Sequence, residues 1–428
     1  MSSTPGYGGA AWRSLYPIVI GLALAYLMQT VVAVSIGDYY SKIMIDIGIA
    51  IVLGVSLGIV NGYAGQFSLG HAGFMAIGGY TAAAIVYYGS IKLFGTKAIY
   101  GGSLGPGELL LFGGCIAGGT LAALAGWLVG QPSLRLRGDY LAIVTLGFGE
   151  IVRVLLKQTD DVVLSEKKVE AASWWSLADN LGGGFGFIGG PRYIDAKNPF
   201  WVWLFVVVVC LVAYRLKYSN RGRQLLAVRE NEIAAEAMGI KTTRAKVSAF
   251  MTSAFFAGIG GGLYAHELGN SLRPADLGFQ KSIDIVIIVV LGGMGSISGA
   301  VIAAIAVTLL PELFRSFAEY RMIAYAMALI IVMLLRPQGL LGSVLHPEVL
   351  ACVHLITLGC IATTCIGVFP VVLHLAMGSK LRADWRDWFL LVAVQLTATG
   401  VASHMALGTY GGVQWSALLL LVALLLQL

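Results

Sequence analysis

A few polar side chains interrupt apolar stretches of this 428-residue sequence, and they are the first candidates for chemistry. Gln66, Ser68 and His71 lie among glycines at positions 62, 65, 70, 73 and 78. An unsatisfied polar group is costly in hydrocarbon, so these side chains should face protein or a water-filled cavity. Glycine also permits a broken helix, whose free backbone amides can hold a carboxylate. The segment therefore predicts either part of a solute pathway or a close-packed helix joint with internally satisfied polar groups.

Charged residues within apolar stretches are rare here and fall into two kinds. Glu150 and Arg153 are three residues apart, so they can neutralise each other on one helix and form a structural ion pair. Asp46 and Asp284 lie near predicted helix starts, where the helix dipole favours a carboxylate. Either aspartate is also a candidate to line a pathway.

Motifs for catalysis and for nucleotide or metal binding are missing or poorly placed. The sequence has no G-x-x-x-x-G-K-[ST] segment, so the chain by itself carries no P-loop, and it has no zinc-binding HExxH. Residues 184–189 formally match GxGxxG, but no strand precedes them, so they are better interpreted as the lip of an external loop. The five cysteines lie in apolar stretches without a CxxC pair and indicate packing. We expect no catalytic residue, metal or cofactor in this chain.

The elements that must position these residues are membrane helices. The chain is 58% hydrophobic and 12% charged, against about 25% charge in a soluble domain, which excludes a disordered chain and disfavours a soluble enzyme. Stretches long enough to cross or enter a bilayer occur at 15–36, 43–60, 69–88, 109–129, 141–156, 200–214, 247–265, 283–310 and 322–335. A glycine-rich break at 292–299 divides the stretch 283–310 into two. We therefore predict an all-α, polytopic bundle of about ten spans.

Two polar loops set the orientation of this bundle. The loop 215–246 has eight basic and three acidic residues, whereas the loop 159–197 has four basic and six acidic ones. The positive-inside rule places the first loop in the cytoplasm and the second outside. The segment 344–428 differs: it adds two or three apolar runs, its topology conflicts with the same rule, and its role is open.

Within the cytoplasmic loop, residues 219–239 predict a short amphipathic helix. Ser219 or Asn220 can cap its start, and Gly239 fits its end. Leu226 and Ile233 would share one face of it with Ala237. Such a helix suits docking of a partner protein, and the alternative is a helix lying on the membrane surface.

This loop resembles the EAA loop of bacterial ABC-importer permeases, although one residue separates its acid from the two alanines and the usual Leu-Pro is absent. By that resemblance, the ATPase-coupling residues are Arg229, Glu232, Ala234, Ala235, Glu236 and Gly239. Further segments resemble branched-chain amino acid permeases of the LivH/LivM type, in family order, at 61–74, 134–143, 290–296 and 336–342. The second of them, Leu-Arg-Leu-Arg-Gly-Asp-Tyr, is similar to the LivM branch. The resemblance covers roughly residues 15–342.

The resemblance implies a permease domain at 1–343 and an additional membrane extension at 344–428. It implies a subunit of an ATP-driven importer of branched-chain amino acids in the bacterial inner membrane, working by alternating access. The expected partners are LivG/LivF-like ATPase subunits that use the ATP, a LivH-like second permease, a periplasmic substrate-binding protein and the lipid bilayer, with no nucleic acid. The candidate pathway residues are Gln66, Ser68, His71 and Asp284. The alternatives are a urea or short-amide ABC permease and an ion-coupled secondary transporter.

Overall fold

The structure is a computed structural model, and it describes most of the chain between residues 37 and 313. The described ranges are 37–97, 101, 105–134, 140–188, 193–194, 198–267 and 272–313, with short stretches between 19 and 32 and between 326 and 340. Within these ranges the regular structure is helical, and β-structure is limited to two isolated bridges, Phe187–Leu272 and Ile194–Glu267. The all-α prediction is therefore confirmed for the described part of the chain.

Long apolar helices dominate the described part. They are α3 (Asp38–Gly58), α4 (His71–Phe94), α5 (Pro106–Ser133), α6 (Tyr140–Lys157), α9 (Phe200–Tyr218), α12 (Thr242–Ala265), α13 (Phe279–Gly292) and α14 (Ile297–Leu313). Within the described residues, five of these are long and apolar enough to span a bilayer: α3 with the π-helix η2 (Ile59–Tyr63), α4, α5, α9 and α12. The chain is therefore a multi-pass membrane protein, and the total of about ten spans stays a prediction.

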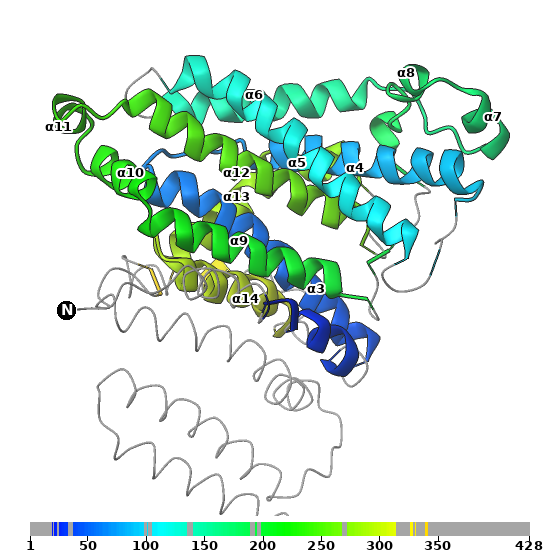
Figure 1. Cartoon of the computed structure of the whole chain (residues 1–428), viewed down its shortest axis with the longest axis horizontal. Coiled ribbons are helices and arrows are strands. Elements are labelled where there is room, and N and C mark those ends of the chain that lie inside the picture. Colours follow the sequence, from blue (N-terminus) through cyan, green and yellow to red (C-terminus); the bar gives the residue numbers. More distant parts are fainter. Residues whose placement is uncertain are drawn as a thin grey trace, which may run out of the picture. The chain divides into compact units, whose positions relative to one another are not determined.

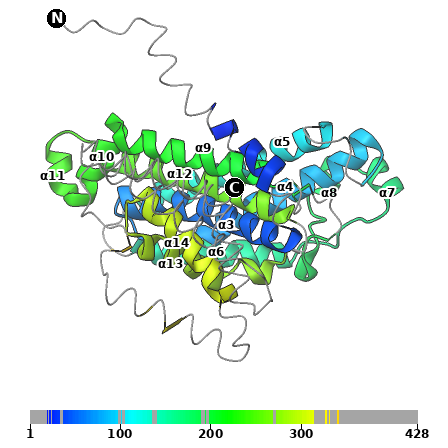
Figure 2. The ribbon, with the colours of Figure 1, turned by 90° about the horizontal axis from the view of Figure 1, so that it is seen from below.

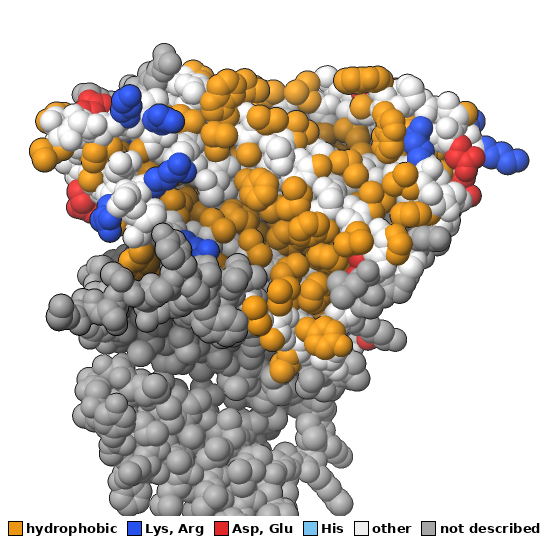
Figure 3. All heavy atoms as spheres, in the orientation of Figure 1, with side chains coloured by type: hydrophobic (Ala, Val, Ile, Leu, Met, Phe, Trp, Pro, Cys, Tyr) orange, Lys and Arg blue, Asp and Glu red, His pale blue; other side chains and the backbone are white. Residues whose placement is uncertain are grey.

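Short helices lie at the two opposite ends of the long ones. Figures 1 and 2 show α10 (Asn220–Glu230) and α11 (Glu232–Ala237) at one end, and α7 (Glu166–Ala171) and α8 (Trp174–Leu177) at the other. Figure 3 shows apolar side chains across the middle and charged side chains of both signs at each end, with Lys and Arg predominating near α10 and α11. This distribution is the one expected of a bundle that crosses a bilayer with the α10–α11 end in the cytoplasm.

Glycine holds α4, α5 and α12 close together. A Cβ atom added at Gly78 of α4 would lie 2.2 Å from Gly258 of α12, and one at Gly118 of α5 would lie 2.5 Å from the Gly78 carbonyl. The three backbones therefore meet with no room for a side chain. Lipid tails are as apolar as the helix side chains, so the hydrophobic effect does not favour helix association in a membrane. Close van der Waals packing through small residues stabilises this contact instead.

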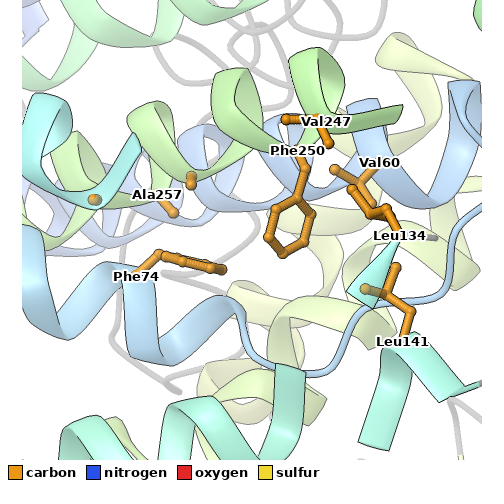
Figure 4. Close-up of a cluster of buried hydrophobic side chains, with 9 residues drawn as sticks. Val60, Phe74, Leu134, Leu141, Val247, Phe250 and Ala257 are labelled. Carbon is orange, nitrogen blue, oxygen red and sulfur yellow. The ribbon is translucent and has the colours of Figure 1, made fainter. Parts of the chain in front are cut away.

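A buried apolar cluster fills the space on the α10–α11 side of that glycine contact. Phe74 of α4 packs edge-on against Phe250 of α12, with ring centroids 5.4 Å apart. Figure 4 shows Val60, Leu134 and Leu141 around these rings. Leu134 follows α5 directly and Leu141 lies in the first turn of α6, so the cluster joins η2, α4, α5, α6 and α12.

The predicted apolar stretches match the helices, with shifted ends. The predicted break after residue 292 is confirmed: α13 ends at Gly292, and a turn with Gly293 at φ 98° and Gly295 at φ 87° leads into α14. The stretch 322–335 and the motif 336–342 lie almost wholly outside the described residues. So do residues 15–18, 20, 24 and 33–36 of the stretch 15–36, residues 135–139 of the motif 134–143, and all of the extension 344–428.

Two local expectations are wrong. The segment 219–239 is two helices, because Asn231 has an extended backbone (φ −159°, ψ 109°) that ends α10 and caps α11. The common face predicted for Leu226 and Ile233 therefore does not form, and Leu225 is the buried leucine. Asp46 is not at a helix start either, since α3 begins at Asp38 and places it in the third turn, where the helix dipole no longer favours it.

Candidate functional site

The loop between α9 and α12 is built from two capped helices. The Ser219 side chain accepts a hydrogen bond from the Gly222 amide and starts α10, which confirms Ser219 as the cap. The Asn231 side chain accepts from the Ala234 amide at 3.0 Å and starts α11. Gly239 ends the segment at φ 84°, a conformation that side chains with a Cβ rarely adopt, with open space around it. A glycine is thus needed at position 239 because of its positive φ, and not because a neighbouring group lies too close for a side chain.

Arg229 of α10 ties this loop to two glycine-rich segments. Its Nη1 atom donates to the Gly62 carbonyl oxygen at 2.9 Å, and a Cβ at Gly65 would lie 2.5 Å from its side chain. Lys217, at the end of α9, donates to the Gly295 carbonyl oxygen at 2.8 Å. We call these five residues the glycine junction. In it, three segments far apart in the sequence meet at one end of the bundle.

A second set of contacts fixes α11 to α12. Lys246 of α12 is 1% exposed and forms an ion pair with Glu232 at 2.5 Å. The Thr242 hydroxyl donates to Glu236 Oε1 at 2.7 Å. Ala235 is buried, whereas Ala234 is exposed. The two acidic residues of the predicted motif therefore attach α11 to α12, with Glu232 half-buried and Glu236 exposed.

The exposed side chains of α11 and of Met238, which follows it, are mostly apolar. Ile233 is 65% exposed and Met238 is 83% exposed. Large apolar side chains exposed to this degree on a polar loop commonly mark a protein interaction site. The loop thus combines an anchored inner side with an apolar outer side.

The glycine-rich segment before α4 forms a helix joint. His71 and Ser68 are each 2% exposed, and the His71 Nε2 atom lies 2.9 Å from the Ser56 hydroxyl oxygen. The Ser68 amide donates to Asn61 Oδ1, and the Leu69 amide donates to Thr145 Oγ1. These two polar side chains therefore face protein, as the packing alternative expected.

Two backbone amides in the first turn of α4 are already hydrogen-bonded. The Ala72 amide donates to Ser282 Oγ at 3.1 Å, and the Gly73 amide donates to the Gly70 carbonyl at 3.0 Å. A carboxylate site made of unpaired amides at the start of α4 is therefore not supported for these positions. Gln66 differs from the others, because its side chain is only half-buried.

The joint also brings α6 and α13 beside α4. A Cβ at Gly73 would lie 2.8 Å from Gly149 Cα, so α4 and α6 touch directly before Glu150. The expected ion pair is confirmed, with Arg153 Nε 2.6 Å from Glu150 Oε2, but the two side chains are 25% and 37% exposed. Gly278, which precedes α13, packs against the same pair. Charged groups are thus open to the surroundings in the second half of α6.

Asp284 of α13 is half-buried in the second turn of that helix, so the helix dipole favours it less than the predicted start would. Gln280 hydrogen-bonds to it, and Lys281 lies nearby. Glu150 and Arg153 lie amid exposed apolar residues of α6 such as Ile151 and Leu155, and the half-buried Asp284 lies on the neighbouring helix α13. Exposed charge on an apolar helix of a membrane bundle indicates an aqueous cavity or a protein partner.

At the end of the bundle away from α10 and α11, the structure contains a buried carboxylate that the sequence analysis did not identify. Glu267 follows α12, is 1% exposed, and pairs with Lys42 of α3 at 2.8 Å. Burial raises the pKa of Glu267 to about 8, and the nearby charge of Asp46 adds to this. Lys42 and Asp46 themselves are paired at 3.7 Å. Glu267 and Lys42 belong to no recognisable motif. In the sequence, only the i, i+4 spacing of Lys42 and Asp46 indicated an ion pair at this place.

The fold and these contacts define a class: a multi-pass helical membrane protein whose glycine-rich motifs gather at one loop. Residues 39–336 match the family described as the permease component of branched-chain amino acid transport systems. The chain belongs to this family. It is 38% identical over 330 residues to the high-affinity branched-chain amino acid transport permease LivM of Salmonella typhimurium, covering 73% of each chain.

Two further relatives extend the comparison. The LivM protein of Escherichia coli is 38% identical over 359 residues, 79% of this chain and 77% of that protein. The LivH protein of Escherichia coli is 31% identical over 151 residues, 35% of this chain and 47% of that protein. No solved structure matches the chain. The expected family membership is thus confirmed.

Proposed function

We propose that the chain is a LivM-type permease subunit of an ATP-driven importer that moves branched-chain amino acids across the bacterial inner membrane. The observation that carries the proposal is the glycine junction together with the apolar outer side of α11. One loop offers a partner two exposed apolar side chains, Ile233 and Met238, and is bonded on its inner side to several membrane segments. The family names of the relatives supply the substrate class.

The contacts suggest how movement of a cytoplasmic ATPase reaches the membrane. A force on α11 passes to α12 through the Glu232–Lys246 ion pair. A force on α10 passes through Arg229 to Gly62, beside the joint that begins α4, and to the turn between α13 and α14. Closure of the ATPase subunits would thus displace α4, α12 and α13 together, which alternating access requires.

The pathway in this proposal follows α6 and α13. The Glu150–Arg153 pair and Asp284, on neighbouring helices, would face a second, LivH-like permease across a water-filled route, with half-buried Gln66 as a further lining residue. An amino acid carries one positive and one negative charge, so lining residues of both signs suit it. Ser68 and His71 are then positioning residues of the joint.

The opposite end of the bundle would receive a periplasmic binding protein. Trp175 is 90% exposed and Phe185 is 77% exposed on the loop that contains α7 and α8. Aromatic side chains of this kind are enriched at protein interfaces. The GxGxxG-like segment contributes Phe185, and this agrees with its interpretation as a lip.

Single-cysteine cross-linking tests the docking of the ATPase. Met238→Cys should cross-link to the ATPase subunit in the assembled importer, with a yield that changes between ATP-bound and ATP-free states. Leu164→Cys is the matched control, since Leu164 is 59% exposed on the loop at the other end. Equal cross-linking from both positions, or none from Met238→Cys in an assembled complex, would contradict the proposal.

Competition separates the substrate classes. In cells that depend on this importer, excess unlabelled leucine, isoleucine or valine should block uptake of labelled leucine, whereas urea and acetamide should not. Inhibition by urea or acetamide alone would favour the alternative, a urea or short-amide permease.

A further inference from the structure

A cavity between α5 and α12 is not used by any step of the proposed transport cycle. Its volume is about 560 Å³, and it opens between the last turns of α5 and the first turns of α12. Its walls include Trp127 and Gln131 from α5, and Lys241 and Arg244 from the start of α12. The cavity therefore lies at the α10–α11 end of the bundle, where Figure 3 shows Lys and Arg side chains.

The chemistry of the walls changes along the helices. Arg244, Ser248 and Met251 are spaced by four and three residues on one face of α12, so the lining passes from charged to polar to apolar. On α5, Gln131 is followed toward the membrane middle by Trp127, which is 43% exposed, and by Leu124, which is 51% exposed. The cavity is thus cationic at the end and apolar toward the middle.

The two cations of this cavity lack acidic partners. Within the described part of the chain, no ion pair involves Lys241 or Arg244, although the same loop pairs Glu232 with Lys246 and Glu230 with Arg229. Both side chains are exposed at the mouth of the cavity. Two unpaired cations above an apolar wall attract a ligand that carries an anionic head and an apolar tail.

We propose that this cavity binds the headgroup of an anionic phospholipid from the cytoplasmic leaflet. Lys241 and Arg244 would hold the phosphate, the Gln131 amide would donate to an ester oxygen, and Ser248 Oγ, which donates to the Ala245 carbonyl, would accept from a hydroxyl of a glycerol headgroup. Trp127 would lie at the level of the headgroups, where tryptophan is enriched in membrane proteins. The acyl chain would run along the exposed leucines of α5. Basic pockets between membrane helices on the cytoplasmic side bind anionic lipid in this manner.

The site adjoins the coupling loop. Lys241 lies two residues after Gly239, and Thr242, the first residue of α12, bonds to Glu236 of α11. A lipid held at Lys241 would therefore fix the start of α12, against which α11 rests. We expect anionic lipid to stabilise the docked position of α11 and to raise the transport rate per ATPase.

Lipid titration of the full-length chain, purified with its importer subunits, tests the proposal. Native mass spectrometry should show phosphatidylglycerol binding in preference to phosphatidylcholine. The Lys241→Gln/Arg244→Gln variant should lose about thirtyfold in phosphatidylglycerol affinity at low salt, with phosphatidylcholine binding unchanged. The matched control, Arg221→Gln/Arg223→Gln, removes two exposed cations of the same loop outside the cavity and should keep wild-type affinity.

A second variant tests the cavity itself. Ser248→Phe fills the space and keeps both cations, so it should also weaken phosphatidylglycerol binding. Equal losses in the cavity and control charge variants would overturn the proposal in favour of general surface attraction. Unchanged binding in Ser248→Phe, or full displacement of the lipid by inorganic phosphate, would overturn it as well, since the site would then hold an anion without its lipid tail.

Discussion

The ion pair between Glu232 and Lys246 should control whether α11 stays attached to α12. Lys246 is 1% exposed and Glu232 is 23% exposed, with their charged atoms 2.5 Å apart. Glu232→Gln leaves the buried ammonium without its carboxylate. Breaking a buried pair from one side costs about 3–5 kcal/mol, and the partial exposure of Glu232 places this case near 3 kcal/mol. A free energy of that size corresponds to about 150-fold in a local equilibrium.

Hydrogen exchange of the α11 segment measures this equilibrium. The Ala235 amide donates to Asn231, and the Ile240 amide donates to Ala235, so both amides are protected only while the helix is formed. Glu232→Gln should raise their exchange rates by up to about two orders of magnitude and uncouple ATP hydrolysis from uptake. The double variant Glu232→Gln/Lys246→Met removes both charges and should recover most of the protection.

Glu230→Gln is the matched control for this prediction. Glu230 is 73% exposed and pairs with Arg229 at the surface, where an ion pair contributes about 1 kcal/mol or less. In the Glu230→Gln variant, the exchange rates of the Ala235 and Ile240 amides should stay near those of the wild type. Similar rates in Glu232→Gln and Glu230→Gln, or no recovery in the double variant, would refute the reasoning.

Three further predictions follow from other contacts. Arg229→Met removes the hydrogen bond to the Gly62 carbonyl and should raise the number of ATP molecules hydrolysed per amino acid imported, whereas an unchanged ratio would count against the glycine junction. Gly261→Ala places a Cβ 1.9 Å from a carbonyl oxygen of α4 and should lower the melting temperature by several degrees, because overpacking costs about 1–3 kcal/mol. Gly113→Ala, which meets nothing within 4 Å, is its control and should melt like the wild type. Because the pKa of Glu267 is raised to about 8, the folded protein keeps a proton that the unfolded chain loses above about pH 4.5. The free energy of unfolding should therefore fall between pH 6.5 and 8, and Glu267→Gln should flatten this slope in melting curves.

The sequence predicted the helices well because apolar length and glycine breaks are local signals. The division at Gly292–Ile297 was visible in the glycines that now adopt positive φ. The split of the coupling helix at Asn231 was not, because an asparagine is compatible both with a helix interior and with a cap, and the tertiary contacts of α11 decide between them.

The site was predicted less completely because its contacts join distant segments. Glu232 was identified from its motif, but its partner Lys246 was counted only as one of the basic residues of the loop. Both His71 and Asp284 were predicted as pathway residues because they are polar. In the structure, His71 is buried and bonds within the joint, whereas Asp284 is only half-buried. Burial distinguishes the two, and burial depends on the packing of α3, α4 and α13.

ATP-driven uptake by the reconstituted importer tests the central claim most directly. The chain would be placed in proteoliposomes with its LivH-like permease, its ATPase subunits and its binding protein, and labelled leucine uptake measured with and without ATP. We predict uptake that requires ATP on the cytoplasmic side and stops when ATP is depleted. Uptake that continues without ATP and follows an imposed proton or sodium gradient would contradict the claim and favour an ion-coupled secondary transporter.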